Sequence, residues 1–535
     1  MRQLQWDDRT FLRWNGFIGL EVDVQCKGIQ FWNKNGLALQ IHNPEIRSNG
    51  DFFRTYAGSI KKLDENRQLF DIHYDSLHWR GADFMSYWDE KNLIFDQLII
   101  FRPDVKWASR NGNDKELPKI NIPRKFFNTI DFNLISLKSL SLNNDKNISI
   151  NPFSELDIWL ENYSLGASEY SIPELIDKGR AKVEVYNFSD TTKSGMERYG
   201  FQQATLNFSL GELAIQNLTF EPLLDRKAYA SAKGVQADHI TATVPLFRVD
   251  EIDWVQCFDK KFEAGKIYFE RAEMKVFRDK NYPPDTNRIK PLPRGILLDL
   301  PWLITIDTIQ FEAMDISYEE KSDQSHLVGQ ISFEDVSGTV GNVTNDDHTI
   351  ISRPFMQLNA KGWLYDESSI QLSVKFDLLS KQNKFTMLAS LAPFNLQKLN
   401  LALEPLARVR VKSGINNKME FRVAANEYYA TGTMDFLYDK LRISILNKKT
   451  FEEKGLGPSL GTFFANTFII NNRNPHFLFA RDGYVFYERD RKKSLFNYWA
   501  KIILSGAVSS IGAENNKKEI KKATDQRIKE FDPLN

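Results

Sequence analysis

The chain has 535 residues, and its 70 Lys and Arg residues balance its 70 Asp and Glu residues, so its formal net charge at pH 7 is zero. Binding to nucleic-acid phosphates needs a basic excess, so this balance argues against a nucleic-acid partner. The only cysteines are Cys26 and Cys257, and the absence of a CxxC pair excludes a zinc site built from thiolates. The length allows two to four compact domains or one long continuous element.

Residues 1–66 read as short β-strands, and the 13% aromatic content of the chain suits a β-rich protein. The opening stretch MRQLQWDDRTFLRWNGF lacks the apolar core that a signal peptide requires. No run of about 20 uncharged apolar residues follows. We therefore expect no membrane-spanning helix and read the chain as given as soluble.

A ten-residue pattern recurs along the chain. Its copies are LQIHNPEIRS (39–48), LIIFRPDVKW (98–107), IYFERAEMKV (267–276) and IQFEAMDISY (309–318). The first, third and eighth places are apolar, and the seventh is an acid in every copy: Glu45, Asp104, Glu273 and Asp315. A weaker copy, LAIQNLTFEP (213–222), lacks the acid.

The spacing of this pattern predicts a kinked strand. The third and eighth side chains would lie on opposite faces of an unbroken strand, and a bulge or kink between them restores a common face. Proline occupies the sixth place of two copies, and it suits a kink because it donates no ladder hydrogen bond. Chance recurrence in a β-rich chain is the alternative. The uneven spacing of the copies argues against a fixed-period solenoid.

Strand and turn patterns divide the chain into five predicted segments. They are N-terminal strands (1–66), a first strand–helix–strand unit with β-sheet (67–248), a second such unit (249–325), a β-meander (326–450), and a helical segment with a charged tail (451–535). Both strand–helix–strand units carry an acid four residues before a tryptophan: Asp75 and Trp79, then Asp250 and Trp254.

The meander alternates clearly in SIQLSVKFDLL, KMEFRV and DKLRISI. This alternation predicts antiparallel strands with one apolar face and one wet face. The candidate residues for an apolar groove are Ile370, Leu372, Val374, Phe376, Leu378, Met419, Phe421, Val423, Ile443 and Ile445.

Residues 494–513, SLFNYWAKIILSGAVSSIGA, predict an amphipathic helix. Asn497, Lys501, Ser505 and Ser509 form one polar stripe on a broad apolar surface. Such a helix either packs on a sheet or lies in a membrane interface. The candidates for membrane contact are Phe496, Trp499 and Ile503. A second short helix is predicted in 451–475, after Pro458, and the charged tail is predicted to be a frayed helix or a disordered end.

No strong catalytic signature occurs: GxSxG, P-loop, HExxH and strand–GxGxxG patterns are absent. His73 and His78 read as partly exposed strand residues. A glycosidase needs two carboxylates about 5–10 Å apart, but each acid of the repeated pattern precedes an apolar residue and fits the wet face of a strand. We therefore expect no enzyme activity, no catalytic residues, no cofactor and no metal.

The kinked strands resemble those of AsmA-like proteins of the bacterial envelope, of the TamB/AsmA type with repeating β-grooves and in a Bacteroidetes-type form. The resemblance also covers VDEIDW…IYFERAEMKVFRDKNYPP, GTVGNVTND, FFANTFIINNRNP and YERDRKKSLFNYWAKIILSGAVSSIGA, within residues 67–513. It implies a mainly β fold with short helices, in which an elongated, curled antiparallel sheet forms a taco-like groove. Relatives are periplasmic and anchored in the inner membrane by an N-terminal helix, which is not visible before Trp6 here.

The resemblance further implies a non-enzymatic protein that binds or conducts phospholipid along the groove between inner and outer membranes, in contact with a membrane surface. Moving an acyl chain of about 16 carbons through water costs on the order of 12 kcal/mol, and an apolar trough removes that cost. Polar substitution of Phe376 or Val374 would then abolish lipid loading. The alternatives are a scaffold for outer-membrane protein assembly without lipid cargo, and a carbohydrate-active enzyme or lectin.

Overall fold

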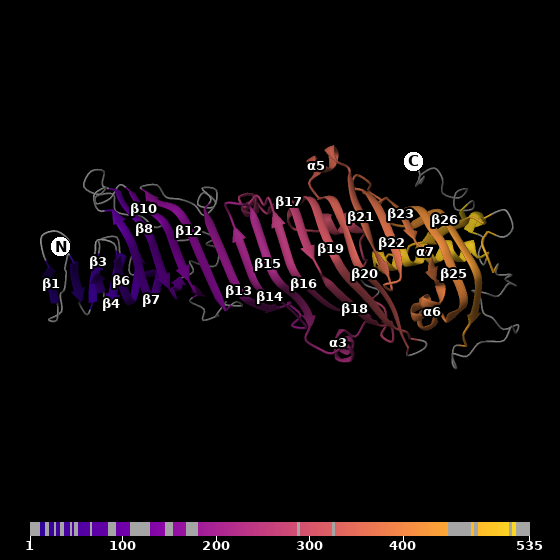
Figure 1. Cartoon of the computed structure of the whole chain (residues 1–535), viewed down its shortest axis with the longest axis horizontal. Helices are drawn as coiled ribbons and strands as arrows, with labels where there is room; N and C mark the ends of the chain where they lie inside the picture. The colour runs from indigo at the N-terminus through magenta and orange to yellow at the C-terminus, as the bar shows by residue number, and fades with distance from the viewer. Residues whose placement is uncertain are drawn as a thin grey trace. The chain divides into compact units, whose positions relative to one another are not determined.

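The structure is a computed structural model (Figure 1). It describes residues 11–15, 21–25, 28–32, 37–42, 45–47, 52–64, 67–83, 92–107, 129–144, 154–166, 180–285, 289–323, 327–447, 472–475, 480–512 and 516–520. The contacts between residues divide the chain into two compact units. The first unit contains residues 1–190, 200–216 and 252–258, and the second contains 191–199, 217–251 and 259–535. The predicted mainly β class with short helices is confirmed.

The first unit is built from strands in its described part. They are β1 (Phe11–Asn15), β2 (Glu21–Gln25), β3 (Gly28–Trp32), β4 (Leu37–His42), β5 (Glu45–Arg47), β6 (Phe52–Asp64), β7 (Arg67–Asp83), β8 (Asn92–Phe101), β9 (Asp104–Trp107), β10 (Thr129–Lys138), β11 (Ser141–Asn144), β12 (Glu155–Gly166) and β13 (Ala181–Thr191). The strands β14 (Glu197–Asn207) and β15 (Glu212–Pro222) are each divided, with some residues in the first unit and the others in the second.

The second unit combines long strands with short helices. Its strands are β16 (Asp238–Asp250), β17 (Lys261–Glu270), β18 (Glu273–Asp279), β19 (Leu303–Lys321), β20 (Val328–Thr344), β21 (Phe355–Leu364), β22 (Ser368–Asp377), β23 (Phe385–Leu391), β24 (Phe394–Asn395), β25 (Val409–Ala425), β26 (Tyr429–Ile445) and β27 (Gly483–Glu488). Its helices are α3 (Arg226–Lys233), α4 (Pro293–Leu298), α5 (Asp347–Ser352), η2 (Leu396–Leu399), α6 (Asn400–Ala407) and α7 (Leu495–Ser510), and η1 (Gln256–Asp259) lies at the boundary.

Strand pairing differs from the prediction in one respect. The meander after β19 is antiparallel throughout, as predicted. However, β8 runs parallel to β10, β9 to β11, and β17 and β18 to β19. The prediction of a purely antiparallel sheet is therefore wrong, and the architecture is mixed. Sequence alternation marks the faces of a strand but not the direction of its neighbour.

The predicted kinks are confirmed, and they share a backbone cause. The fifth residue of the pattern has a positive φ in each copy whose fifth residue is described: Arg102 (45°), Asn217 (53°), Arg271 (51°) and Ala313 (51°). This residue is the first of the two that separate β8 from β9 and β17 from β18, whereas β19 continues through it with a register shift. In the first copy β4 ends at His42 and β5 begins at Glu45, with Asn43 and Pro44 outside the described residues.

The kink keeps the apolar side chains on one face. Phe311 and Ile316, the third and eighth residues of the last copy, align with Gly338 and Phe333 on β20. These two align in turn with Ala360 and Leu364 on β21. The strand β21 pairs with β22 without a register shift, so Ala360 and Leu364, which are four residues apart on β21, share a face. Phe311 and Ile316 therefore lie on the same side of the sheet.

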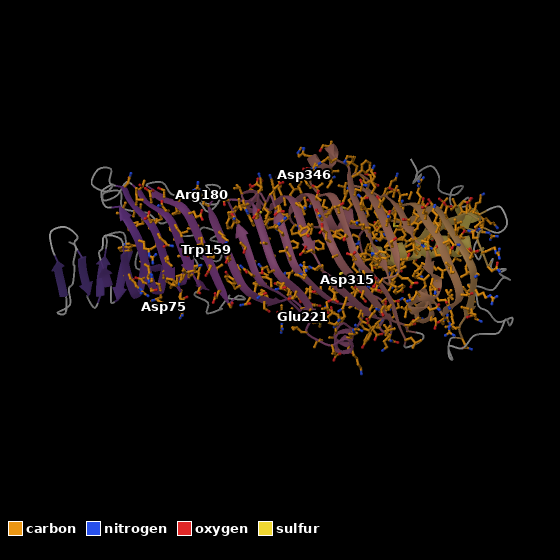
Figure 2. All side chains as sticks on the ribbon, viewed as in Figure 1. Asp75, Trp159, Arg180, Glu221, Asp315 and Asp346 are labelled. Atoms are coloured by element: carbon orange, nitrogen blue, oxygen red, sulfur yellow. The ribbon has the colours of Figure 1, made fainter. Side chains whose placement is uncertain are left out.

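Neighbouring strands accept hydrogen bonds from the backbone N–H groups of the kink residues Arg102 and Ala313. The kink residue Ala313 donates its N–H to Ser337 Oγ at 3.0 Å, and Asp335 on β20, which also has a positive φ, donates its N–H to Asp315 Oδ1 at 3.1 Å. Arg102 N–H bonds to the Lys138 carbonyl at 2.8 Å. Glu273 and Asp315 are exposed, in agreement with the wet-face prediction, and Asp104 is half-buried. Figure 2 labels Asp315 on β19.

The two units contain the same strand arrangement. In the first, β7 pairs with both β8 and β9, and β8 lies parallel to β10. In the second, β16 pairs with both β17 and β18, and β17 lies parallel to β19. The predicted second strand–helix–strand unit is present as β16–η1–β17, whereas residues 84–91 of the first insert lie outside the described residues.

The acid–tryptophan pairs do not correspond between these units. Trp79 aligns with Leu98 within β7 and β8, and the equivalent partner of Ile267 is Val249, not Trp254. Trp254 follows the end of its strand, whereas Trp79 lies within β7. The predicted C-terminal helix is present as α7, and most of residues 451–475 and of the tail lie outside the described residues.

Candidate functional site

An apolar surface covers one side of β8, β10 and β12 in the first unit. Its centre is formed by Phe95, Phe132 and Ile135, and the Phe95 and Phe132 rings stack with centroids 5.2 Å apart. The Trp79 ring lies 5.7 Å from that of Phe95. We call this the first-unit apolar face; its further members are Leu93, Leu98, Ile130, Leu137, Leu160 and Tyr163.

Strand register places these side chains in rows. Leu98 aligns with Ile135, and Ile135 with Leu160. Phe95 aligns with Phe132, and Phe132 with Tyr163. Aligned side chains on adjacent strands lie about 4.5–5.5 Å apart, so each row forms a continuous apolar strip across the strands.

The centre of this face is buried, because Phe95, Phe132 and Ile135 are only 8–9% exposed, but the side chains around it are partly accessible. The described part of the first unit contains no α-helix. Trp79, Leu98 and Leu137 are only half-buried. Large apolar side chains that remain partly accessible in adjacent rows mark a surface for an apolar ligand or partner.

Charged side chains occupy the other side of the same strands. Trp159 alternates with Leu160 on β12, and Figure 2 labels it. The Lys138 ammonium lies 3.8 Å from the Trp159 ring centroid and 2.8 Å from Asp157 Oδ2. In this part of the first-unit sheet, Trp159 with its charged neighbours and the apolar cluster that contains Leu160 therefore lie on opposite sides of β12.

The meander candidates of the second unit have a different environment. Val374, Leu378 and Val423 have exposed fractions of 0%, 1% and 1%. The complete set divides into buried residues (Val374, Phe376, Leu378, Met419, Phe421, Val423) and half-buried residues (Ile370, Leu372, Ile443, Ile445). The buried ones belong to one large core cluster of this unit.

Helix α7 closes this second apolar side. The Tyr498 ring packs edge-on against Phe385, and Ile502 is fully buried in the same core cluster. Gly506 brings the helix backbone close to Met434 and Val485. In Figure 1, α7 crosses behind the strands around β22–β25. The helix is thus packed on a sheet, which is one of the two environments considered from the sequence.

A buried ion pair holds the segment between β27 and α7 against the turn between β25 and β26. Arg489, whose side chain is 0% exposed, lies 2.6 Å from Glu427 Oε1. Its Nη2 donates to the Lys290 carbonyl at 2.6 Å, which ties the segment before α4 to the same place. Removal of Glu427 would leave Arg489 buried without its partner. Removal of Arg489 would leave Glu427 only its 3.1 Å contact with the partly exposed Arg491, so the Arg489–Glu427 pair holds the cover in position.

Of the membrane-contact candidates, Phe496 is exposed on α7, whereas Trp499 and Ile503 pack against the second-unit core. Phe496 is 68% exposed, and its ring lies 5.8 Å from that of Trp499. Trp499 and Ile503 are half-buried. Within the described residues, no helix reaches the length and apolar character needed to cross a membrane.

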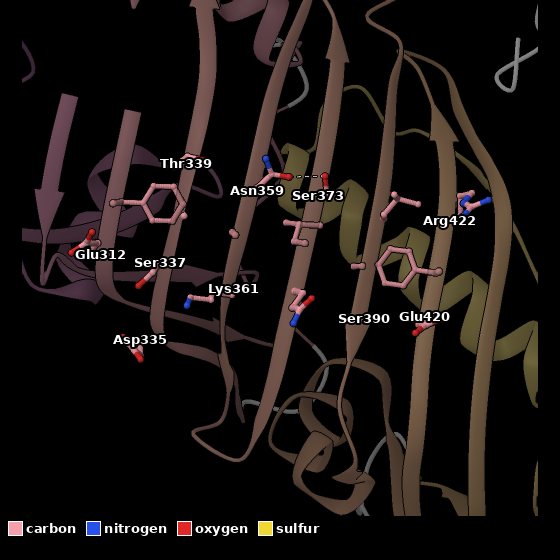
Figure 3. Close-up of a pocket in the computed structure, with 18 of the residues that line it drawn as sticks. Glu312, Asp335, Ser337, Thr339, Asn359, Lys361, Ser373, Ser390, Glu420 and Arg422 are labelled. Atoms are coloured by element: carbon pink, nitrogen blue, oxygen red, sulfur yellow. Dashed lines mark hydrogen bonds between the residues drawn. The ribbon is translucent and has the colours of Figure 1, made fainter. Parts of the chain in front are cut away.

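A hollow of about 1260 Å³ lies on the polar side of β19–β26 (Figure 3). On β26 its lining includes Thr433 and Asp435, whereas Met434 between them is buried on the opposite side. Charged lining residues of both signs include Lys361, Glu420 and Arg422. Of the ten predicted groove residues, Leu372 and Phe421 are among the residues that line this hollow, and the other eight are not.

Among the described residues, the carboxylate with the most strongly lowered pKa is fully engaged. Burial alone would raise the pKa of Glu197, but hydrogen bonds from Thr192, Ser194, Tyr229 and Lys233 outweigh it and lower the pKa to about 2. Tyr229 Oη donates at 2.7 Å and Lys233 Nζ at 3.0 Å. A perturbed pKa can mark a catalytic acid or base, but these partners instead attach α3 to the neighbouring strands.

Sequence reasoning missed part of this organisation. Residues 135–144, ISLKSLSLNN, form another kink with Ser139 at φ 54°, and Asp157 Oδ1 accepts its N–H. The copy was overlooked because Ser141 replaces the acid, although Ile135, Leu137 and Leu142 keep the apolar spacing. The first-unit apolar face was also missed, since the clear alternation of the meander directed attention there.

No family model matches the chain, and no curated protein matches it. The function therefore has to be argued from the two apolar surfaces and the polar hollow.

Proposed function

We propose that the protein binds the acyl chains of phospholipid on the first-unit apolar face, as a non-enzymatic protein of the bacterial envelope. The observation that carries the proposal is the set of apolar rows on β8, β10 and β12, in which half-buried side chains such as Leu98, Leu137 and Leu160 surround a buried centre, with no α-helix in the described part of that unit. Transfer of an acyl methylene from water to an apolar surface contributes about 0.8 kcal/mol. Extended rows suit a flexible chain better than a compact ligand.

The kinks support the same proposal. They keep successive apolar side chains on one side while the strand changes direction, as at Phe311 and Ile316. Within the first unit, the kinks at Arg102 and Ser139 repeat this device on the neighbouring strands β8–β9 and β10–β11. Such an apolar surface suits movement of lipid between the inner and outer membranes of the periplasm, in contact with a membrane surface.

The test compares matched substitutions on the two apolar surfaces. Mass spectrometry of lipid extracted from the purified full-length protein measures its lipid content. We expect Leu137→Gln with Leu160→Gln to lose most of the bound phospholipid with an unchanged circular dichroism spectrum. As a control on the polar side, Gln97→Asn should leave the content unchanged. Because Val374 is fully buried, its polar substitution tests packing rather than lipid contact.

Lipid content that is unaffected by Leu137→Gln with Leu160→Gln would contradict the proposal. A lipid-free wild-type protein would favour the second candidate, a scaffold for outer-membrane protein assembly without lipid cargo. The observation that favours a scaffold is the sealed second-unit side, where Val374, Leu378 and Val423 are packed by the protein itself.

A further inference from the structure

The last described strand, β27, has one free edge among the described residues, because it pairs only with β26. Along a strand, the N–H and C=O groups of one residue point toward the strand on one side, and those of the next residue point toward the strand on the other side. On β27 the groups that point away from β26 belong to Tyr484 and Phe486. An edge of this kind is normally a template for pairing with another strand.

Side chains at the C-terminal end of the described chain occupy these backbone groups. Tyr484 N–H donates to Ser509 Oγ at 3.1 Å, and Phe486 N–H donates to Ser505 Oγ at 3.2 Å. Ser505 Oγ donates back to the Phe486 carbonyl at 2.8 Å, and Asn516 Nδ2 donates to the Tyr484 carbonyl at 2.6 Å. All four outward groups of the two residues are thus satisfied by side chains.

The geometry of helix and strand explains why two serines suffice. Residues four apart on a helix are separated by about 6 Å along its axis, and residues two apart on a strand by about 6.6 Å. Ser505 and Ser509 therefore match Phe486 and Tyr484 in an antiparallel arrangement. Close approach depends on glycine, because a Cβ at Gly483 would lie 2.0 Å from Ser510 Oγ, and one at Gly506 would lie 2.7 Å from Met434 Cε.

We propose that α7 is an edge cap, in which Ser505, Ser509 and Asn516 replace the hydrogen bonds of a missing strand and prevent β27 from pairing with β27 of a second copy. This role explains why half of the polar stripe on α7, Ser505 and Ser509, is buried rather than exposed. It is independent of whether the protein carries lipid.

A second copy of β27 fits the uncapped edge. When two such strands run antiparallel with Tyr484 opposite Phe486 of the other copy, the same four backbone groups of each strand form the ladder bonds. Val485 then lies opposite Val485 of the second copy, on the side of the strand that α7 covers at Gly506. Each copy loses the cap and gains an equal number of hydrogen bonds.

The test uses the position of Val485 directly opposite Val485 of the second copy. Val485→Cys is introduced into the full-length protein in which Cys26 and Cys257 are replaced by serine. Mild oxidation and non-reducing electrophoresis then measure disulfide-linked dimer. We expect Ser505→Ala with Ser509→Ala to increase the dimer at least tenfold over the same protein with both serines present. Gly506→Leu, which pushes α7 away, should have the same effect.

Substitution of exposed α7 residues, Phe496→Ala with Lys501→Ala, serves as the matched control and should not increase the dimer. Equal crosslinking with and without the serines would overturn the proposal. So would folded serine and Gly506 variants that give no crosslinked dimer. Loss of the fold in both variants would also overturn it, because the proposal requires the strands to persist without the cap.

Discussion

The strands β8, β10 and β12 of the first unit and the strands β22–β26 of the second unit are built from the same kind of sequence and have different surfaces. Both place large apolar side chains on one side and polar side chains on the other. In the second unit, α7 converts that apolar side into a closed core around Val374 and Tyr498. In the first unit only the centre of the rows, Phe95, Phe132 and Ile135, is buried, and the side chains around it remain half-buried in the described residues.

The difference teaches that alternation assigns side chains to a face but does not determine what covers the face. The cover of the second unit comes from residues more than 100 positions after β22, and its attachment depends on single groups such as Arg489 and Ser505. An apolar face becomes a core or a binding surface according to such distant segments.

The largest expected effect breaks the attachment of the cover. Arg489→Ala leaves Glu427 buried without its closest cation, and we expect it to lower the free energy of unfolding by about 3–5 kcal/mol. Urea unfolding followed by tryptophan fluorescence measures the change. Arg491, which also contacts Glu427 but has a side chain 42% exposed, is the matched control, and Arg491→Ala should cost less than about 1 kcal/mol. Equal effects of the two would show that the buried pair does not hold the cover.

A smaller effect compares equivalent leucines of the two surfaces. Leu378→Ala removes a fully buried side chain and should cost about 2–5 kcal/mol, because a cavity remains. Leu98→Ala on the half-buried first-unit face should cost only about 1 kcal/mol, since part of that side chain is already in water. Urea midpoints of both variants measure the ratio. A larger loss for Leu98→Ala would mean that the first-unit face is a sealed core.

The smallest effect concerns the kinks, which the two units share. Arg102 and Arg271 have φ values of 45° and 51°, a region in which a Cβ is strained and glycine is not. We expect Arg102→Gly and Arg271→Gly each to stabilise by up to about 1 kcal/mol. Arg271→Val should destabilise by about 1–2 kcal/mol, because a β-branched residue suits this region least. Thermal unfolding of the three variants checks these signs, and stabilisation by valine would contradict the kink geometry.

Much of the local structure could be predicted from the sequence. The pattern shared by residues 98–107, 267–276 and 309–318 identified the kinks, because a spacing of five is incompatible with an unbroken strand face. The parallel pairing of β17 with β19 could not be predicted, since the direction of a neighbour leaves no period in the sequence. The polar stripe of α7 was visible, but its contact with the edge of β27 requires knowledge of which strand is last.

The candidate site was predicted less well than the fold. Val374 and Phe376 were selected because their strand alternates most regularly, and regular alternation is equally suitable for a covered core. The first-unit face was less visible because its members do not alternate: Phe95 and Leu98 are three residues apart, and Asn162, with a φ of 48°, separates Leu160 from Tyr163.

The most direct test of the account is photo-crosslinking with a phosphatidylethanolamine that carries a diazirine in its acyl chain. The full-length protein is incubated with vesicles of this lipid, irradiated, and digested for peptide mass spectrometry. The account predicts that lipid adducts concentrate on residues 92–101, 129–138 and 155–166, and are rare on residues 368–377 and 409–445. Adducts confined to the latter two ranges, or no adducts above those of an unrelated soluble protein, would contradict it.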